Sequence, residues 1–162
     1  MSDFQALIRL AVAADAPAME AVRYEAIRSI DAAFYSASEL EEWVGDRKSH
    51  LEKLAICKDH ILRVVAERDQ DLIGFGEMNI ATGLISGCFV KTSAKGLGLG
   101  QKIIAALEER ARGFGLNFLQ LEASRNAKGF YLACGFRAAN CNEITIINPR
   151  NDLCAMMRKD LI

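Results

Sequence analysis

The chain has 162 residues, of which 51% are hydrophobic and 25% are charged, a composition that excludes a disordered protein. The formal net charge is −1, from 20 basic and 21 acidic residues, and this balance excludes a general electrostatic attraction to nucleic acid or to an anionic membrane. The chain does not open on a basic segment followed by a long apolar run, and no stretch approaches the ~20 apolar residues of a membrane helix, so we expect a soluble cytoplasmic protein with a single domain over residues 1–162.

The first third of the chain is predicted to hold a strand and then helices. Residues 6–13 are apolar and strand-like, and Asp15 follows them as the cap of a helix. Ser38 and Glu41 form an S-x-x-E capping box, which predicts a second helix. A third, short helical piece is expected over 50–57.

The remainder of the chain alternates strands with helices. Strands are expected over 61–67, 72–78, 84–90, 117–123, 136–147 and 153–160, helices over 99–112 and 126–134, and a final turn over 148–151. The first two of these strands form a hairpin, whereas the strand–helix–strand unit from 84 to 123 gives a parallel pair with a right-handed crossover. We therefore expect an α/β (α+β) fold, a mixed, mostly antiparallel central sheet with helices on both faces, in the order β-α-α-β-β-β-α-β-α-β-β.

The five cysteines do not indicate a metal site. They stand at positions 57, 88, 134, 141 and 154, their number is odd, and no C-x-x-C pair occurs. His50 and His60 lie far from any ligand spacing, so no metal is expected. We interpret the cysteines as small buried hydrophobic residues of a reducing compartment.

A glycine-rich loop, SAKGLGLGQKII over residues 93–104, has the features of an anion site. A helix that begins directly after such a loop offers free backbone N–H groups and the positive end of its dipole, which together bind anions. Glycines let a phosphate approach the backbone closely. Lys91 and Lys95 add positive charge, and no acidic residue lies between Lys91 and Glu108. The loop therefore predicts a phosphate or pyrophosphate ligand.

Two common nucleotide motifs fail at the same position of this loop. Both the P-loop, G-x-x-x-x-G-K-S/T, and the dinucleotide fingerprint, G-x-G-x-x-G, demand glycine where the chain has Gln101. Glu122 still ends the next strand, where a ribose-binding acid would lie, so a Rossmann-type nucleotide-binding module stays open as an alternative. A purely structural glycine turn is a further alternative.

Two motifs together give a more specific match. The segment FVKTSAKGLGLG resembles the acetyl-CoA-binding segment of the GNAT N-acetyltransferase superfamily, R/Q-x-x-G-x-G/A, with Lys95, Gly98 and Gly100 in the motif positions and lysine in place of the usual arginine or glutamine. The segment NAKGFYLACGF, residues 126–136, resembles the N-x-x-x-F-Y-x-x-x-G-F signature of the same family. The resemblance covers residues 61–136 well and implies the family fold, which matches the strand order predicted above.

The resemblance also implies acetyl-CoA as the cosubstrate and a set of residues that bind it. The pyrophosphate of CoA would lie on Lys95, Gly96, Leu97, Gly98, Leu99, Gly100 and Gln101, and the pantetheine arm would bond to the backbone of Phe89 and Val90. Asn126, at the start of the following helix, would reach the cofactor. Tyr131 takes the place of the tyrosine with which family members commonly protonate the leaving thiolate.

The carboxylate with which many relatives deprotonate the amine is missing here. Residues 82–86, early in the strand before the loop, carry no acid. Glu77, on the adjacent strand, is the predicted substitute and would act through water, and Glu122 is a further candidate. Cys88 is interpreted as a packing residue, because no histidine is placed to activate it.

The implied activity is transfer of the acetyl group to a primary amine of a small molecule or peptide, by direct attack in a ternary complex. The first two helices would bind this acceptor, with aromatic and acidic candidates at Tyr24, Tyr35, Trp43, Asp31, Glu39, Glu41 and Glu42. A protein that holds acetyl-CoA without efficient chemistry is an alternative, since the usual glutamate is missing. The sequence leaves the possibility of a homodimer open.

Overall fold

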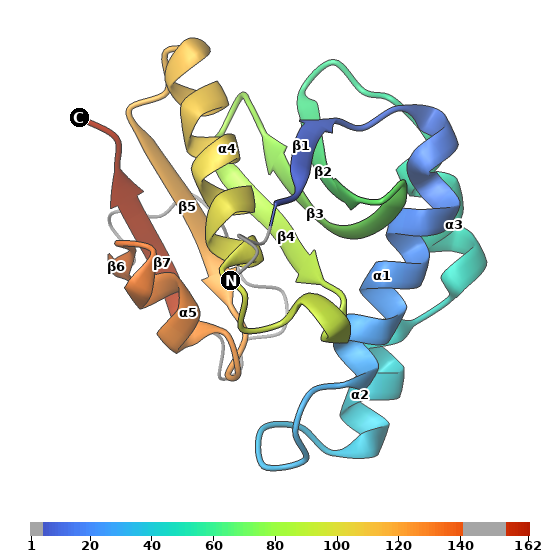
Figure 1. The fold of residues 1–162 in the computed structure, drawn as a ribbon. Coiled ribbons are helices and arrows are strands. Elements are labelled where there is room, and N and C mark those ends of the chain that lie inside the picture. The colour runs from blue at the N-terminus through green and yellow to red at the C-terminus, as the bar shows by residue number, and fades with distance from the viewer. Residues whose placement is uncertain (1–4, 141–154) are drawn as a thin grey trace.

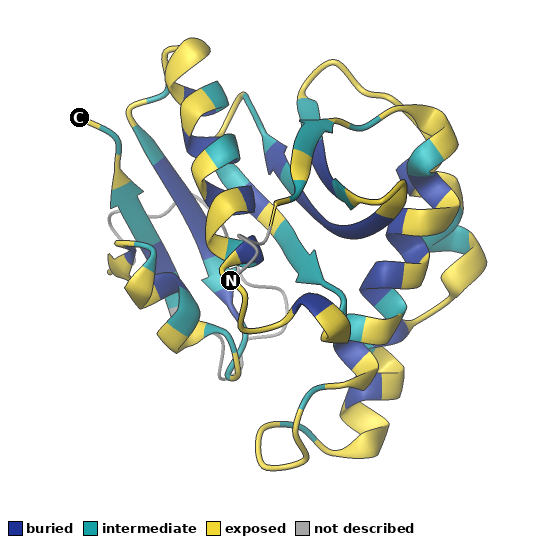
Figure 2. Ribbon diagram, viewed as in Figure 1, coloured by how far each residue is buried: buried dark blue, intermediate teal, exposed yellow. Residues whose placement is uncertain are grey.

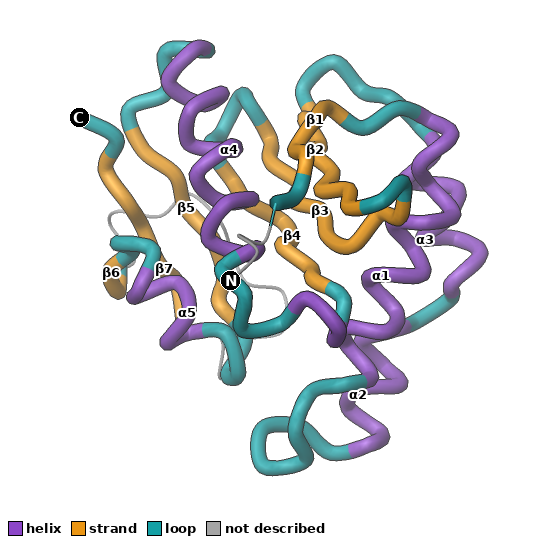
Figure 3. The backbone as a smooth tube through the Cα atoms, viewed as in Figure 1, coloured by secondary structure: helices purple, strands orange, loops and turns teal. Residues whose placement is uncertain are grey.

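The computed structural model describes residues 5–140 and 155–162, and its strands form one mixed sheet in the order β1-β2-β3-β4-β5-β7-β6 (Figure 1). The strands are β1 (Leu7–Leu10), β2 (Ile61–Arg68), β3 (Asp71–Asn79), β4 (Leu84–Val90), β5 (Phe118–Ala123), β6 (Arg137–Ala138) and β7 (Ala155–Asp160). The helices are α1 (Ala16–Arg28), α2 (Ala37–Val44), α3 (Arg47–Ala55), α4 (Leu99–Gly113) and α5 (Lys128–Ala133) (Figure 3). Neighbouring strands are antiparallel except β4 and β5, which confirms the predicted fold class and contradicts the Rossmann-type alternative, whose sheet is mostly parallel.

The second helix begins earlier than the sequence predicted, and the expected Ser38–Glu41 capping box is wrong. The hydroxyl of Ser36 accepts a hydrogen bond from the Glu39 N–H (3.2 Å), and the Glu39 carboxylate accepts one from the Ser36 N–H (2.9 Å). Both frames read S-x-x-E, so the sequence pattern alone could not choose between them. Glu41 instead pairs with Arg28, which joins α2 to α1.

Alternate residues of β3 show how helices cover both faces of the sheet. Gly74 and Gly76 face α4, and a Cβ atom at either position would stand 2.9 or 2.7 Å from side-chain carbons of Ile103. Phe75 points to the opposite face, where it is buried with residues of α1 such as Met19. Buried residues thus lie on both faces of the sheet, so the core has two layers with the sheet in the middle. Figure 2 shows the buried segments of β3, α1 and α4 in dark blue.

The C-terminal strands lie partly outside the described residues. The predicted strand over 136–147 is described only as the short β6, and the predicted turn over 148–151, together with Cys141 and Cys154, lies outside the described residues. The other predicted strand appears as β7, which lies antiparallel between β5 and β6. Within residues 5–140 and 155–162, none of the helices combines the length and apolar character that a membrane crossing requires.

Candidate functional site

A cleft opens where β4 and β5 separate. The two strands pair only over the first two residues of β4. Ser86 is the extra residue of a β-bulge, because Glu77 of β3 pairs with Gly87 while Met78 pairs with Ile85. A bulge bends its strand, and beyond this point the described strands form no further β4–β5 pairs. A cavity of about 740 Å³ lies in the gap.

One end of the cleft, which we call the cofactor end after the ligand that the sequence predicts there, is formed by residues 91–101, the loop that leads into α4. Its 3₁₀ turn is fixed to α1 by a hydrogen bond of 2.9 Å from the Thr92 N–H to the Glu25 carboxylate. Gly98 caps α4 in the left-handed conformation (φ +77°), which favours glycine. No side chain of the described residues caps α4, so the N–H groups of its first turn are available to an anion. Lys95 lies exposed beside them.

Gly100, in the first turn of α4, lets α5 pack closely against this helix. A Cβ atom at Gly100 would lie 2.9 Å from the ring of Phe130, closer than real contacts allow. The Phe130 ring in turn contacts the Tyr131 ring edge-on, with 5.0 Å between centroids. Tyr131 also meets Phe136, at 5.7 Å, and is therefore held on both sides. Packing between the two helices thus positions Tyr131 at the cleft.

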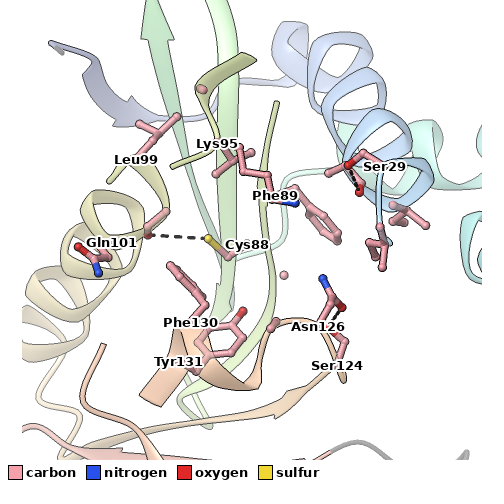
Figure 4. A pocket seen from close by; sticks show the side chains of 18 of the residues that line it. Ser29, Cys88, Phe89, Lys95, Leu99, Gln101, Ser124, Asn126, Phe130 and Tyr131 are labelled. Carbon is pink, nitrogen blue, oxygen red and sulfur yellow. Dashed lines mark hydrogen bonds between the residues drawn. The ribbon is translucent and has the colours of Figure 1, made fainter. Parts of the chain in front are cut away.

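The hydroxyl of Tyr131 points into the cleft, while its ring is buried (Figure 4). Burial raises the pKa of this hydroxyl well above its usual range, and the neighbouring Cys88 and Cys134 act in the same direction. A phenol with a raised pKa is protonated at neutral pH, so Tyr131 is available as a proton donor.

Cys88 lies on β4 at the floor of the cleft, where its Sγ is 4.0 Å from the carbonyl oxygen of Gly100 (Figure 4). Burial, and to a smaller extent the neighbouring Cys134, raises the pKa of the Cys88 thiol to about 12. The thiolate, rather than the thiol, is the nucleophile in cysteine chemistry. The environment of Cys88 therefore supports a packing role rather than a covalent one.

Asn126 lies on the same wall of the cleft as Tyr131. Its Oδ1 accepts a hydrogen bond of 2.8 Å from the hydroxyl of Ser124, which turns the amide NH₂ group towards the cleft (Figure 4). An amide held in this way can donate hydrogen bonds to a bound ligand.

Two carboxylates differ in how they reach the cleft. Glu77 is absent from the cleft lining, because it accepts hydrogen bonds from the Arg63 Nε (2.5 Å) and the Ser86 hydroxyl (2.6 Å). Arg63 also donates to carbonyl groups at the end of α3, such as that of Ile56 (3.1 Å), so Glu77 helps to hold α3. Ser86 lines the cleft and is the link between it and Glu77. Glu122 lines the cleft directly and makes no hydrogen bond or ion pair with any described residue.

The opposite end of the cleft, which we call the acceptor end after the prediction that the first two helices bind the acceptor, is formed by Ala26, Ile27, Ile30, Asp31, Phe34 and Trp43. Arg125, from the loop after β5, holds the α1–α2 loop beside it. The Arg125 guanidinium donates to the Phe34 carbonyl (2.8 Å), lies 4.6 Å from the centre of the Tyr35 ring and pairs with Glu39 (3.6 Å). The Arg125 N–H donates to the Tyr35 hydroxyl, 90 residues away in the chain. Sequence reasoning missed Arg125, because no local pattern signals such a distant contact.

The structure brings most of the predicted site residues together around the cleft. Its lining includes Phe89, Val90, Lys95, Gly96, Gly98, Leu99, Gly100, Gln101, Asn126 and Tyr131. Leu97 and Glu77 are outside the lining, and Leu97 is exposed. Of the predicted acceptor residues, Asp31 and Trp43 line the cleft, whereas Tyr24, Tyr35, Glu39, Glu41 and Glu42 do not. The described residues include no group of three or more His, Cys, Asp or Glu side chains that could hold a metal ion.

Comparisons with known proteins agree on one family. The sequence model for the acetyltransferase (GNAT) domain matches residues 31–145. The chain is 32% identical over 101 residues to the "IAA acetyltransferase" of Azospirillum brasilense, and this match covers 57% of the chain and 66% of the relative, just under two thirds of its length.

Two solved structures have the same fold. A GCN5-related N-acetyltransferase from Rhodopseudomonas palustris gives a TM-score of 0.81 at 24% identity and covers 99% of this chain and 98% of its own. The PaiA N-acetyltransferase from Thermoplasma acidophilum, solved in complex with coenzyme A, gives a TM-score of 0.78 at 21% identity, with 97% of this chain and 99% of its own covered.

Proposed function

This chain belongs to the GNAT acetyltransferase family, and we propose that it is an N-acetyltransferase that moves the acetyl group of acetyl-CoA to the primary amine of a small molecule or peptide. The observation that carries this proposal is the cleft between β4 and β5, which begins at the N-terminus of α4 and contains the hydroxyl of Tyr131. The cleft therefore offers an anion site at the N-terminus of α4, a free strand edge on β4 and a proton donor in the Tyr131 hydroxyl.

The two parts of acetyl-CoA suit two features of the cleft. The N–H groups of the first turn of α4, beside Lys95, suit a pyrophosphate, and Gly98 allows close approach of the chain to it. The backbone of Phe89 and Val90 lies on the edge of β4 that β5 leaves unpaired. An extended arm with amide groups can bind such an edge as an added strand would. The pantetheine arm has this chemistry.

Tyr131 is proposed as the general acid. When the amine nitrogen attacks the thioester carbonyl, the new C–N bond replaces the C–S bond and the sulfur leaves with an electron pair. The Tyr131 hydroxyl, which is protonated at neutral pH because burial raises its pKa, would donate its proton to this sulfur. Bulk solvent then returns a proton to the phenolate. Asn126 would position the cosubstrate through its amide NH₂ group.

Glu77 is proposed to receive the proton of the amine, but through Ser86 rather than by direct contact. The Ser86 hydroxyl donates to Glu77 and lines the cleft, so its oxygen can take a proton from the amine or a water while its own proton passes to the carboxylate. Glu122 is the second candidate because it lines the cleft directly. Glu77→Gln and Glu122→Gln, compared by their pH–rate profiles, distinguish the two.

The proposal is tested by binding and turnover together. Thermal unfolding with acetyl-CoA, CoA and NAD should show stabilisation by the first two ligands only. A panel of amines should then give release of CoA and an acetylated product, which mass spectrometry identifies. Stabilisation by acetyl-CoA with no product from any amine would favour the alternative of a non-catalytic acetyl-CoA-binding protein. Stabilisation by NAD alone would contradict the proposal altogether.

A further inference from the structure

We propose that the acceptor is an arylalkylamine, a primary amine joined by a short alkyl chain to an aromatic ring. The inference rests on the proposed function, because it names the substrate class of the same cleft. It comes from the acceptor end, where the lining combines aromatic rings with a carboxylate, that of Asp31, which has no cationic partner among the described residues.

Two aromatic rings lie at this end, and a third, that of Phe89, belongs to the same hydrophobic cluster as Trp43. Phe34 comes from the α1–α2 loop, Trp43 from α2 and Phe89 from β4. Figure 4 shows the Phe89 ring on the side of the cleft that faces α1. Phe34 is 43% exposed although it lines the cleft, so its ring offers apolar surface that a ligand can cover. Ile27 of α1 and Ile30 of the α1–α2 loop extend the apolar wall. Small-molecule sites are typically lined in this way, with mainly apolar walls and a few polar groups that fix orientation.

Charge in the cleft is divided between its two ends. Among the described residues that line it, the only cationic side chain is Lys95, at the cofactor end. The acidic side chains are Asp31, at the acceptor end, and Glu122, on β5. Neither carboxylate pairs with a cationic side chain of the described residues, and Asp31 accepts only the backbone N–H of Ala33 (2.8 Å). The Asp31 carboxylate therefore suits a cationic group at the acceptor end.

A free alkylamine meets these conditions. It is protonated at neutral pH, since its pKa lies near ~10.4, and aromatic faces as well as carboxylates attract such a cation. It must lose the proton before it attacks the thioester. Recruitment by Asp31 and deprotonation through Ser86 and Glu77 are then separate steps, carried by different residues.

Other amine classes fit this lining less well. An aminoglycoside would bring many hydroxyl groups, and each buried hydroxyl needs a hydrogen-bond partner. The described side chains that could satisfy them at this end are few: the Asp31 carboxylate and the Trp43 indole N–H, with the Ser29 hydroxyl at its border. A polyamine would bring several charges to a wall that is mostly apolar. An aromatic ring would cover Phe34 and Trp43 without either cost.

The chain provides its own reporter for this test, because Trp43 is its one tryptophan and lines the acceptor end. With CoA bound, so that no reaction occurs, 2-phenylethylamine should change the fluorescence of Trp43 in a saturable manner. Kanamycin and spermidine, at equal concentration, should change it little. Turnover with acetyl-CoA should follow the same ranking in kcat/KM.

Two variants and their controls assign the effect to the acceptor end. Phe34→Ala and Asp31→Asn should each raise the apparent Kd of 2-phenylethylamine by about 5- to 30-fold, the factor that one lost contact of this size gives. Phe114→Ala removes a ring of similar exposure (56%) outside the cleft, and should leave the Kd unchanged. All variants should retain acetyl-CoA affinity, which shows that they are folded.

The outcomes separate this inference from the proposed function. If kanamycin or spermidine is acetylated with a higher kcat/KM than 2-phenylethylamine, the substrate class is wrong and the acetyltransferase stands. If 2-phenylethylamine binds saturably but no amine is acetylated, the acceptor end does bind an arylalkylamine, but the proposed acetyltransferase function is wrong. If Phe34→Ala and Phe114→Ala affect binding equally, the acceptor end does not recognise the ring, and the inference is overturned.

Discussion

The two ends of the cleft are built in opposite ways. The cofactor end consists of one continuous segment, residues 91–101, and presents backbone N–H groups at the start of α4. The acceptor end consists of side chains from α1, α2 and the loop between them, and it is held by Arg125 from the other side of the cleft. Affinity for a ligand that binds backbone groups depends little on which side chains are present, whereas affinity for a ligand that binds side chains depends on each of them. We therefore expect the cofactor to be common to the family and the acceptor to be particular to this chain.

The largest expected effect concerns Tyr131, which stands between the two ends. Tyr131→Phe keeps the buried ring and its contacts with Phe130 and Phe136 but removes the proton. Because general acids contribute roughly 10²–10⁴ in rate, kcat should fall by about that factor while the Kd of acetyl-CoA stays the same. Tyr24→Phe is the matched control, since Tyr24 lies outside the cleft lining. An unchanged kcat in the Tyr131→Phe variant would leave Tyr131 a packing residue only.

The next effect tests whether the cofactor end depends on close packing. In Gly100→Ala the new methyl group would meet the Phe130 ring at 2.9 Å, and overpacking of this kind typically costs about 1–3 kcal/mol. The melting temperature should fall, and the Kd of acetyl-CoA, measured by calorimetry, should rise by about 5- to 150-fold.

Gly113→Ala is the control at the other end of the same helix. No atom lies within 4 Å of a Cβ built there, so this substitution should leave cofactor binding as it is. Equal effects of the two substitutions would mean that the packing of Phe130 on Gly100 does not shape the cofactor end.

The contrast between the ends also explains what the sequence could predict. The loop and helix of the cofactor end, with Gly98 and Gly100, are local in sequence, so a motif records them. The order of strands and helices along the chain, and the hairpin of β2 and β3, follow from local hydrophobic patterns and turn signals, and were predicted for the same reason. The clamp of Arg125 on the α1–α2 loop depends on two segments 90 residues apart, and no spacing rule describes it.

Glu77 shows a second limit of sequence reasoning. Its position on the strand next to β4 was predicted correctly, but strand periodicity did not reveal the bulge at Ser86 or the pairing with Arg63. Register shifts of one residue are decided by the whole sheet rather than by the strand itself. The side of the sheet on which a carboxylate lies, and its partner there, therefore required the structure.

A third prediction tests the acceptor end through its clamp. Arg125→Ala removes a hydrogen bond to the Phe34 carbonyl, a ring contact with Tyr35 and an ion pair with Glu39. The α1–α2 loop should become looser, and the KM for the amine should rise by about 5- to 30-fold, equivalent to 1–2 kcal/mol. The KM for acetyl-CoA should not change, because Arg125 does not line the cleft.

Arg28→Ala is the control for this substitution, since Arg28 joins α1 to α2 through Glu41 and its side chain is more exposed (48%) than that of Arg125 (27%). Arg125→Lys should restore only part of the affinity, because lysine lacks the planar group that lies over Tyr35. If Arg125→Ala raises the KM for both substrates alike, the two ends of the cleft do not bind their ligands independently.

The smallest effect concerns pH and the helices that support the acceptor end. Burial lowers the pKa of His50, on α3, and the nearby Arg23 acts in the same direction. The Arg23 guanidinium lies 3.3 Å from the His50 Nε2 and also donates to the last carbonyl groups of α2, at Trp43 and Val44. Neutral His50 can accept a hydrogen bond from Arg23, whereas protonated His50 would place two cations together.

The sign of the pH dependence follows from this lowered pKa. As the pH falls below ~6.5, the usual value for histidine, the unfolded chain binds a proton that the folded chain does not, so the free energy of unfolding decreases. One proton limits this decrease to about 1.4 kcal/mol per pH unit, and above ~6.5 the contribution is constant. Urea unfolding at several pH values should show a smaller decrease for His50→Gln than for the parent, with His60→Gln as the control. Hydrogen exchange at low pH should rise in α2 and α3 before it rises in α4, because His50 and Arg23 join α3 and α1 to the end of α2 and do not touch the helix of the cofactor end. Equal loss of protection in α4 would show that the two ends unfold as one unit.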